Sequence, residues 1–321
     1  MAQITIVSPT GAGTRTGNLH TAQRYARFLR GAGHRVSVAT GWDGRACDLL
    51  IALHARRSHE SVLRYTRVRP GRPLIVVLTG TDLYRDLPAS AEARESLRLA
   101  DRVIVLQEDG LRVIDKATRR KARVVYQSSA AAAGHAPPKG VYRLAVIGHL
   151  REEKDPFRAV QALAQLKEFG KLELVQLGEA LTPGMGETAK QWMAKDARYH
   201  WLGSVPHSRA LGWIAHSHLL VVSSVMEGGA NVICEAARIG TPVLASRVSG
   251  NIGMLGRNYP GFYDLFKESQ LAGLIRKAVE DKSYYHRLKT LLSARRKLFA
   301  PSAEQRALLQ QLSDLGARRR A

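Results

Sequence analysis

Apolar runs alternate along the chain with segments in which apolar residues recur at every third or fourth position. The runs are short and rich in Val, Ile and Leu, which is typical of strands buried on both faces of a sheet. The segments between them predict amphipathic helices. This alternation favours a parallel sheet covered by helices on both sides. In the first half we expect strands at 3–8, 35–40, 49–53, 74–78, 102–106 and 123–126, and helices at 18–31, 58–67 and 90–99.

An alanine-rich stretch that ends in Pro137, Pro138, Lys139 and Gly140 interrupts this pattern. We interpret residues 129–140 as a linker between domains. The same alternation begins again after it, so the second half predicts a further α/β domain. Its strands are expected at 142–147, 172–177, 200–202, 219–223 and 242–245, and its helices at 156–169, 186–196, 208–215, 231–239 and 269–280.

The predicted fold class is therefore α/β, with two Rossmann-like, doubly wound domains that face each other across a cleft. The first domain would span 1–128 and the second 141–283. Residues 284–321 have helical spacing, broken at Pro301, and could pack back on the first domain. Ligands of doubly wound sheets bind outside the carboxyl ends of the strands, so we expect the functional site in the cleft.

Length and composition indicate a globular protein. The chain has 321 residues, of which 45% are apolar, and no run of 18 consecutive apolar residues predicts a membrane span. The N-terminus enters a strand directly, without the pattern of a signal peptide. Cys47 and Cys234 are the only cysteines, which favours free thiols and a cytoplasmic location.

The formal net charge is +22. A charge of this size permits contact with nucleic acid or anionic membranes and attracts phosphorylated substrates. The cations are spread along the chain, and no nucleic-acid-binding module or basic stretch with interleaved aromatic residues is found. We therefore interpret the charge as a solvated basic surface and expect no nucleic-acid partner.

The stretch from Ser223 to Ala236 gives the strongest chemical signal. A buried apolar run precedes it, Gly228 and Gly229 follow Glu227, and a helical segment comes next. A helix start presents unpaired backbone N–H groups, and its dipole favours anions. Because carboxylates do not bind a phosphate, Glu227 and Glu235 are interpreted as acceptors for hydroxyls of a sugar or ribose attached to it. The stretch predicts a nucleotide-sugar site.

The signatures of several other enzyme classes are absent from the sequence. It has no Gly-x-x-x-x-Gly-Lys motif of a P-loop NTPase and no Gly-x-Ser-x-Gly motif of an α/β-hydrolase. The glycine spacing of the first loop misses the full dinucleotide fingerprint. The histidines lack His-Glu-x-x-His spacing and the two cysteines are far apart, so we expect no metal site.

Two loops of the first half are candidates for acceptor or phosphate binding. The first follows the initial strand, and the second follows the strand at 74–78. Each has an ordinary alternative, since such loops are often tight turns or helix caps. A catalytic role is not expected for His54 or His59, and His20 is interpreted as a helix residue. The candidates are Gly11, Gly13, Thr14 and Arg15 in the first loop, and Thr81 and Asp82 in the second.

Four stretches of the second half occur in the order of a known family: Val146 to Lys154, Leu202 to Pro206, 227–246 and Ser249 to Gly253. Together they resemble family-4 glycosyltransferases of the GT-B fold, which have a glycine-rich turn at the last of these stretches. The chain departs from the family at His149, where an arginine is usual, and Arg151 could substitute for it.

The resemblance also implies roles for these residues. Glu227 would contact hydroxyls of the transferred sugar and Glu235 the ribose. Lys154 would neutralise the leaving diphosphate, together with Arg151 or His149. No Asp-x-Asp motif that could hold a metal is present, so metal-free neutralisation is the consistent alternative. The remaining donor-binding candidates are Gly203 and Val205 for the base, and Gly228, Gly229, Ala230 and Asn231 for the diphosphate or sugar.

The first half resembles a narrower group, the selenosugar synthases of selenoneine biosynthesis, in 8–18 and 79–84. This resemblance implies transfer of the sugar of UDP-N-acetylglucosamine to selenium from selenophosphate, forming a C–Se bond. It implies that no cofactor is needed, since UDP-sugar and selenophosphate are both substrates. It also implies that the product is passed to other enzymes of the pathway. A GT-B glycosyltransferase with a hydroxyl or lipid acceptor, a UDP-sugar epimerase or hydrolase, and a basic nucleic-acid binder remain alternatives.

Overall fold

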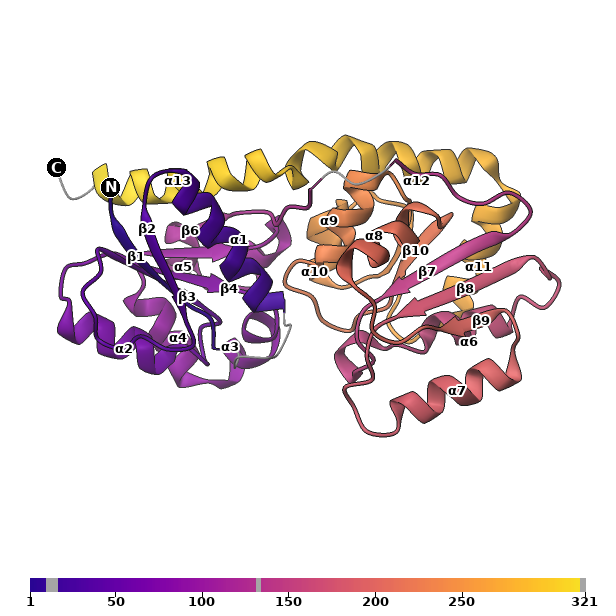
Figure 1. The fold of residues 1–321 in the computed structure, drawn as a ribbon, viewed down its shortest axis with the longest axis horizontal. Helices are drawn as coiled ribbons and strands as arrows, with labels where there is room; N and C mark the ends of the chain where they lie inside the picture. Colours follow the sequence, from indigo (N-terminus) through magenta and orange to yellow (C-terminus); the bar gives the residue numbers. More distant parts are fainter. Residues whose placement is uncertain (10–16, 131–133, 318–321) are drawn as a thin grey trace. The chain divides into compact units, whose positions relative to one another are not determined.

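The computed structural model of the chain describes residues 1–9, 17–130 and 134–317. It divides into two compact units, one of Met1–Gln127 with Pro301–Ala321 and one of Ser128–Ala300. Each unit is built on a parallel sheet flanked by helices (Figure 1). The predicted class of two doubly wound α/β units is confirmed.

The described residues of the first unit form a six-stranded parallel sheet in the order β2-β1-β3-β4-β5-β6. Every residue of β3 and β4 is buried, as their continuous apolar runs predict. The order reverses between β1 and β3, which makes the carboxyl ends of these strands the switch point of the sheet. The strands are β1 Gln3–Val7, β2 Arg35–Ala39, β3 Leu49–Leu53, β4 Leu74–Leu78, β5 Arg102–Val105 and β6 Ala122–Val124.

Helices cover both faces of this sheet. On one face Tyr25 of α1 and Leu308 of α13 pack in one core cluster with Ile4 of β1. On the other, Tyr65 of α2 and Leu97 of α4 share a cluster with strand residues. The helical elements are α1 Gly17–Gly31, α2 His59–Val68, η1 Asp82–Asp86, α3 Leu87–Ala89, α4 Ala91–Leu99, η2 Glu108–Arg112, α5 Lys116–Lys121 and α13 Pro301–Ala317.

The C-terminal helical segment is divided between the two units. Its first part belongs to the second unit, and α13 belongs to the first, where Arg24 of α1 pairs with Glu304 at 2.7 Å. The predicted break is found at Pro301, the first residue of α13, because proline is tolerated where a helix begins and its missing N–H is not needed.

The described residues of the second unit form another six-stranded parallel sheet, in the order β12-β11-β10-β7-β8-β9. Numbered from β7, this is the strand order of dinucleotide-binding sheets. Its switch point lies between the carboxyl ends of β7 and β10. The strands are β7 Tyr142–Ile147, β8 Leu172–Leu177, β9 Tyr199–Trp201, β10 Leu219–Val222, β11 Val243–Ser246 and β12 Phe262–Tyr263.

The helices of the second unit include one that the sequence did not predict. Residues 249–253, expected to form a glycine-rich turn, begin helix α10, so that expectation is wrong. The elements are η3 Glu152–Lys154, α6 Arg158–Ala164, α7 Met185–Lys195, α8 His207–Ala215, α9 Asn231–Ile239, α10 Ser249–Leu255, α11 Glu268–Glu280, α12 Lys282–Arg295 and η4 Arg296–Phe299. Among the described helices, none is both long and apolar enough to cross a bilayer.

Candidate functional site

A pocket opens at the switch point of the second sheet. Gly148 and His149, directly after β7, line it together with Ser223 and Ser224, directly after β10. Lys154 of η3 also lines it, as does Val232 in the first turn of α9. The pocket therefore lies where doubly wound sheets bind their ligands.

Lys154 and Glu227 meet beside this pocket. The Lys154 ammonium pairs with Glu227 Oε1, which also accepts a hydrogen bond of 2.6 Å from Ser224 Oγ. The Glu227 side chain is 10% exposed and that of Lys154 24% exposed. The pair thus places a cation and a hydroxyl-binding carboxylate at one point of the site.

Backbone contacts fix both partners of this pair. The Val225 N–H donates to Glu153 O at 2.9 Å, and Ser223 Oγ donates to Lys154 O at 2.9 Å. These bonds tie η3 to the loop that carries Glu227. The position of Lys154 therefore follows from the loop after β10 and not from its own short element alone.

The Glu227 loop rests on the start of α10. A Cβ added at Gly250 would lie 1.8 Å from Glu227 O, so only glycine allows this approach. The buried amide of Asn251 donates to Ser246 O and Ser246 Oγ at 3.0 Å, and Ser246 Oγ donates to Ser224 O at 2.5 Å. Gly250 and Asn251, which were expected to lie in a turn, thus hold the loop that carries Glu227 in place.

Helix α9 begins directly after Gly228, Gly229 and Ala230. Its first N–H groups have no partner within the helix, which makes this end suitable for an anion. Glu235 lies one turn further along and is nearly buried, with Oε1 2.8 Å from Nε2 of His207 at the start of α8. The hydrogen bond and the charge of Glu235 raise the pKa of His207, and burial opposes them.

His149 lines the pocket as a neutral ring. Its Nδ1 accepts a hydrogen bond of 3.2 Å from the Glu179 N–H, and burial, followed by the charge of Arg151, lowers its pKa. The loop after β7 lies close to the loop after β8: a Cβ at Gly178 would lie 2.0 Å from Gly148 O. These glycines allow the two strand ends to approach each other at the pocket.

The loop after β9 lies beside the end of β8. Gly203 has a φ of +65° and its carbonyl accepts from the Gly178 N–H at 2.7 Å. Val205 packs against the cluster of Val175, Leu177 and Ala210. Gly203 and Val205 are thus near the Gly148–Gly178 loops, and no bond joins them to the Lys154–Glu227 pair among the described contacts.

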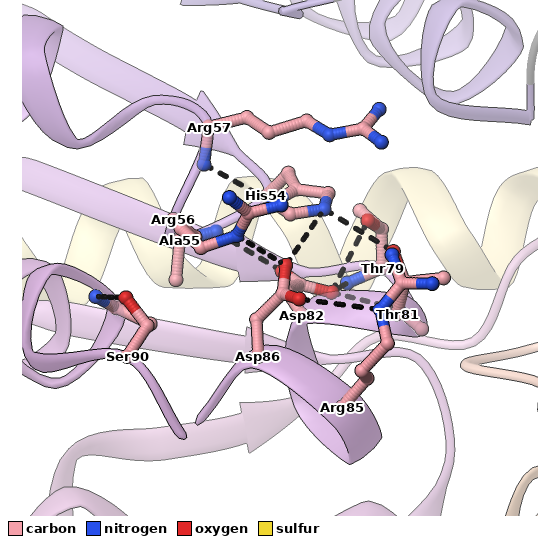
Figure 2. A network of polar contacts seen from close by, with 12 residues as sticks. His54, Ala55, Arg56, Arg57, Thr79, Thr81, Asp82, Arg85, Asp86 and Ser90 are labelled. Carbon is pink, nitrogen blue, oxygen red and sulfur yellow. Dashed lines mark hydrogen bonds and ion pairs between the residues drawn. The ribbon is translucent and has the colours of Figure 1, made fainter. Parts of the chain in front are cut away.

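In the first unit a polar network joins the carboxyl ends of β3 and β4 (Figure 2). The carboxylate of Asp82 is fully buried and accepts from the Thr79 and Gly80 N–H groups at 2.8 Å and from the Ala55 N–H at 3.0 Å. These bonds use both oxygens of Asp82. Asp82 therefore shapes the two loops, and its contact with an acceptor stays a prediction.

His54 lies at the centre of this network (Figure 2). Its φ is +71°, and its Nδ1 accepts from the Arg57 N–H at 3.2 Å, so a neutral ring carries its proton on Nε2. That nitrogen lies 3.2 Å from Thr81 Oγ1 and 3.6 Å from Asp86 Oδ2. Burial lowers the pKa of His54, although the carboxylates of Asp82 and Asp86 oppose the shift.

Asp86 links His54 to two arginines. Its Oδ2 is 2.9 Å from Arg56 Nε, and its Oδ1 is 3.4 Å from Arg85 Nε. Burial raises the pKa of Asp86, but the hydrogen bonds and charges of the arginines outweigh it and hold that pKa below its ordinary value. The network therefore presents a neutral imidazole beside an ionised carboxylate and two guanidinium groups.

The model of one protein family, glycosyl transferases group 1, matches residues 127–291, just over half of the chain. The chain belongs to this family. The match begins before β7 and ends within α12, and it includes Lys154, Glu227 and Glu235.

Solved structures similar to this glycosyltransferase share its two-domain fold. HepE from Anabaena, in complex with UDP-glucose, has a TM-score of 0.78 at 16% identity, over 98% of this chain and 100% of its own. Sucrose-phosphate synthase from Thermosynechococcus elongatus has a TM-score of 0.80 at 16% identity, over 99% and 100%. A glycosyltransferase from Rickettsia africae has a TM-score of 0.75 at 13% identity, over 98% of both chains. These similarities confirm the predicted GT-B fold.

The predicted donor-site residues lie together in the structure, whereas the predicted residues of the first loop are not among the described residues. Lys154, His149, Glu227 and the α9 start surround the switch point of the second sheet. The candidates Gly11, Gly13, Thr14 and Arg15 lie outside the described residues. Within the described ranges, no three His, Cys, Asp or Glu side chains form a group that could hold a metal ion. Metal independence stays a prediction.

Sequence reasoning missed two polar partners of the predicted residues, since Ser224 and His207 bind the two glutamates. It also missed the pair of Asp86 and His54, for which no role was expected. His207 directly follows the predicted base loop, which ends at Pro206, but only the fold shows that it faces Glu235. Asp86 lies four residues after Asp82, on the same short helical segment, but only the fold shows that it faces His54.

Proposed function

We propose that this glycosyltransferase uses UDP-N-acetylglucosamine as donor and transfers the sugar to the selenium of selenophosphate. The observation that carries the donor half is the Lys154–Glu227 pair at the switch point of the second sheet. The complex of HepE with UDP-glucose, a protein of the same fold, supports a UDP-sugar as the donor.

Each donor-site residue has a task in this proposal. The start of α9 and the Lys154 ammonium receive the diphosphate, and the negative charge that develops on the leaving UDP is balanced there. Glu227 accepts hydrogen bonds from hydroxyls of the sugar, and Glu235 accepts those of the ribose. Lys154 must then exchange its carboxylate partner for the diphosphate when the donor binds.

The reaction step is a substitution at the anomeric carbon. An electron pair of selenium forms the C–Se bond, while the bond from that carbon to the β-phosphate oxygen breaks and its pair leaves with UDP. A selenium anion is polarisable and needs little help from a base, unlike a sugar hydroxyl. The neutral, buried His54 and the guanidinium groups of Arg56 and Arg85 are consistent with an acceptor that arrives already anionic.

Support for selenium comes from the resemblance of residues 8–18 and 79–84 to selenosugar synthases. The second of these stretches contains Thr81 and Asp82, which lie in the network around His54. The basic composition of the chain would attract both anionic substrates.

The proposal is tested in two steps. Calorimetry with UDP comes first, and lack of binding would remove every UDP-sugar reading. The protein is then incubated with UDP-N-acetylglucosamine in the presence of selenophosphate, of a hydroxyl or lipid acceptor, or of no acceptor, and the products are analysed by mass spectrometry. We expect UDP together with a selenium-bearing sugar. Release of UDP only with a hydroxyl or lipid acceptor, or sugar release into water at the same rate without acceptor, would exclude the selenosugar assignment.

A further inference from the structure

His207 and Glu235 form a pair with unequal freedom. The Glu235 side chain is 11% exposed and fixed on α9, whereas that of His207 is 68% exposed at the first residue of α8. The 2.8 Å contact joins His207 Nε2 to Glu235 Oε1. Because His207 is largely in solvent, its ring can turn away without leaving a cavity. The Glu235 side chain is nearly buried and cannot turn away in the same manner.

A proton on His207 depends on this one carboxylate. A cation at a helix N-terminus is disfavoured by the helix dipole, and His207 is the first residue of α8. The other charged groups on the two packed helices are the cations Arg209 of α8 and Arg238 of α9. Strand β7 also packs against α8, and its Arg143 guanidinium lies over the Trp213 ring of that helix. Neither α8 nor α9 contains an acidic residue other than Glu235. The charged form of His207 is therefore no longer stabilised if Glu235 binds another partner.

We propose that His207 occupies Glu235 Oε1 when the site is empty and is displaced by the ribose hydroxyls of the nucleotide, with release of a proton. The inference rests on the proposed donor site, since it requires Glu235 to bind the ribose. A ribose that offers two neighbouring hydroxyls needs both carboxylate oxygens, and His207 holds one of them. His207 is thus a specificity-determining residue, because its competition for Glu235 sets how strongly the site prefers a nucleotide with ribose hydroxyls. The same competition makes this preference dependent on pH.

The test compares UDP with 2′,3′-dideoxyuridine 5′-diphosphate. Both carry the same titrating phosphates, so the ratio of their Kd values reports on the ribose hydroxyls alone. At low pH a charged His207 competes for Glu235, and at high pH the competition weakens. We expect the preference for UDP to increase about two- to fivefold from pH 5.5 to pH 8, the size expected for an exposed ion pair.

The matched variants are His207→Gln and His200→Gln. His200 is a second histidine near a carboxylate, on the edge strand β9 of this sheet; its side chain is 42% exposed and its Nε2 lies 3.8 Å from Glu173 Oε1. His207→Gln should give a preference that no longer changes with pH, and His200→Gln should keep the wild-type change. Calorimetry in buffers of different ionisation enthalpy should also detect proton release with UDP and not with the dideoxy analogue.

The outcomes separate this inference from the proposed function. If UDP does not bind at any pH, the donor site itself is wrong. If UDP binds with a preference over the analogue that is constant with pH, the displacement of His207 is wrong and the donor site stands. If UDP binds without any preference, the ribose contact of Glu235 is wrong as well. An equal loss of the pH dependence in His200→Gln would also overturn the role of His207.

Discussion

Lys154 and Glu227, 73 positions apart in the sequence, form an ion pair at the carboxyl edge of the second sheet. The pair holds the Lys154 ammonium where it could neutralise a bound diphosphate. It also keeps a nearly buried carboxylate compensated while the site is empty, since an unpaired buried charge is costly. In the proposed donor complex, the diphosphate would replace Glu227 as the partner of Lys154.

Replacement of Lys154 tests its part in leaving-group stabilisation. We expect Lys154→Ala to slow turnover, because its activation free energy should rise by about 2–4 kcal/mol, as for the loss of an oxyanion donor. The measurement is the rate of UDP release at saturating donor. Lys190→Ala, an exposed lysine on α7, should keep the wild-type rate. A wild-type rate in Lys154→Ala would remove the residue from the mechanism.

Replacement of Glu235 tests the ribose contact. Glu235→Ala should weaken UDP binding by about 1–3 kcal/mol, because the hydroxyls lose charged acceptors. Isothermal titration calorimetry gives the change, and Glu187→Ala on α7 is the control with an unchanged Kd. Unchanged UDP affinity in Glu235→Ala would refute the assignment.

The sequence predicted much of the fold because buried parallel strands have a strong local signal. The bounds of β3, β4, β7 and β8 agree with the predicted ranges. β3 and β4 are continuous apolar runs, and β7 and β8 are mostly apolar with one or two polar residues each. Helix α9 agrees as well, because Gly240 has a φ of +101° directly after it and only glycine adopts that conformation readily.

The missed elements depend on contacts between distant residues. Strand β12 has two residues, too few for a periodicity, and it exists because β11 pairs with it. Helix α10 begins with Ser249 and Gly250, a composition typical of turns. Its glycine is needed for the approach to Glu227, a residue of another loop.

The candidate site was predictable in its glutamates and lysine but not in their partners. The strand, glycine pair and helix around Glu227 are local in sequence. The His207–Glu235 pair depends on how α8 packs beside α9, and the His54–Asp86 contact depends on the adjacency of β3 and β4. A single sequence contains no local pattern for such pairs.

Replacement of Asp82 tests its structural role in the first unit. Asp82→Ala leaves the N–H groups of Ala55, Thr79 and Gly80 without their acceptor, so we expect a loss of about 2–4 kcal/mol in the free energy of unfolding. Urea denaturation measures it, and Asp43→Ala, an exposed control, should change stability little. Equal stability of the two variants would contradict the role of Asp82 in joining the loops.

Two glycine substitutions should act in opposite directions. Gly250→Ala places a Cβ 1.8 Å from Glu227 O, and the backbone must move, so we expect a loss of about 1–3 kcal/mol in stability. Gly273→Ala, inside α11 with nothing near its added Cβ, should gain about 0.5–1 kcal/mol. Gly250→Ala should also lower UDP affinity. Equal effects of the two changes on stability would show that the close approach at Gly250 is unimportant.

Acid should destabilise the second unit through His218. Its ring stacks on Tyr142 with 4.2 Å between centroids, its Nδ1 accepts from the Arg143 N–H at 3.0 Å, and burial lowers its pKa to about 4. The unfolded chain, with a histidine pKa of about 6.5, binds more protons between these values. Stability is therefore complete above about pH 6.5 and decreases as the pH falls toward 4.

The contribution of His218 to this slope can be isolated by substitution. His218→Asn keeps an acceptor near the Arg143 N–H but does not titrate, so its stability should change by about 1–3 kcal/mol less than wild type between pH 7 and pH 4. His286→Asn, on the exposed side of α12, should keep the wild-type slope. Because burial also lowers the pKa of His135, some pH dependence should remain in His218→Asn. A slope identical to wild type in that variant would mean that protonation of His218 does not limit acid stability.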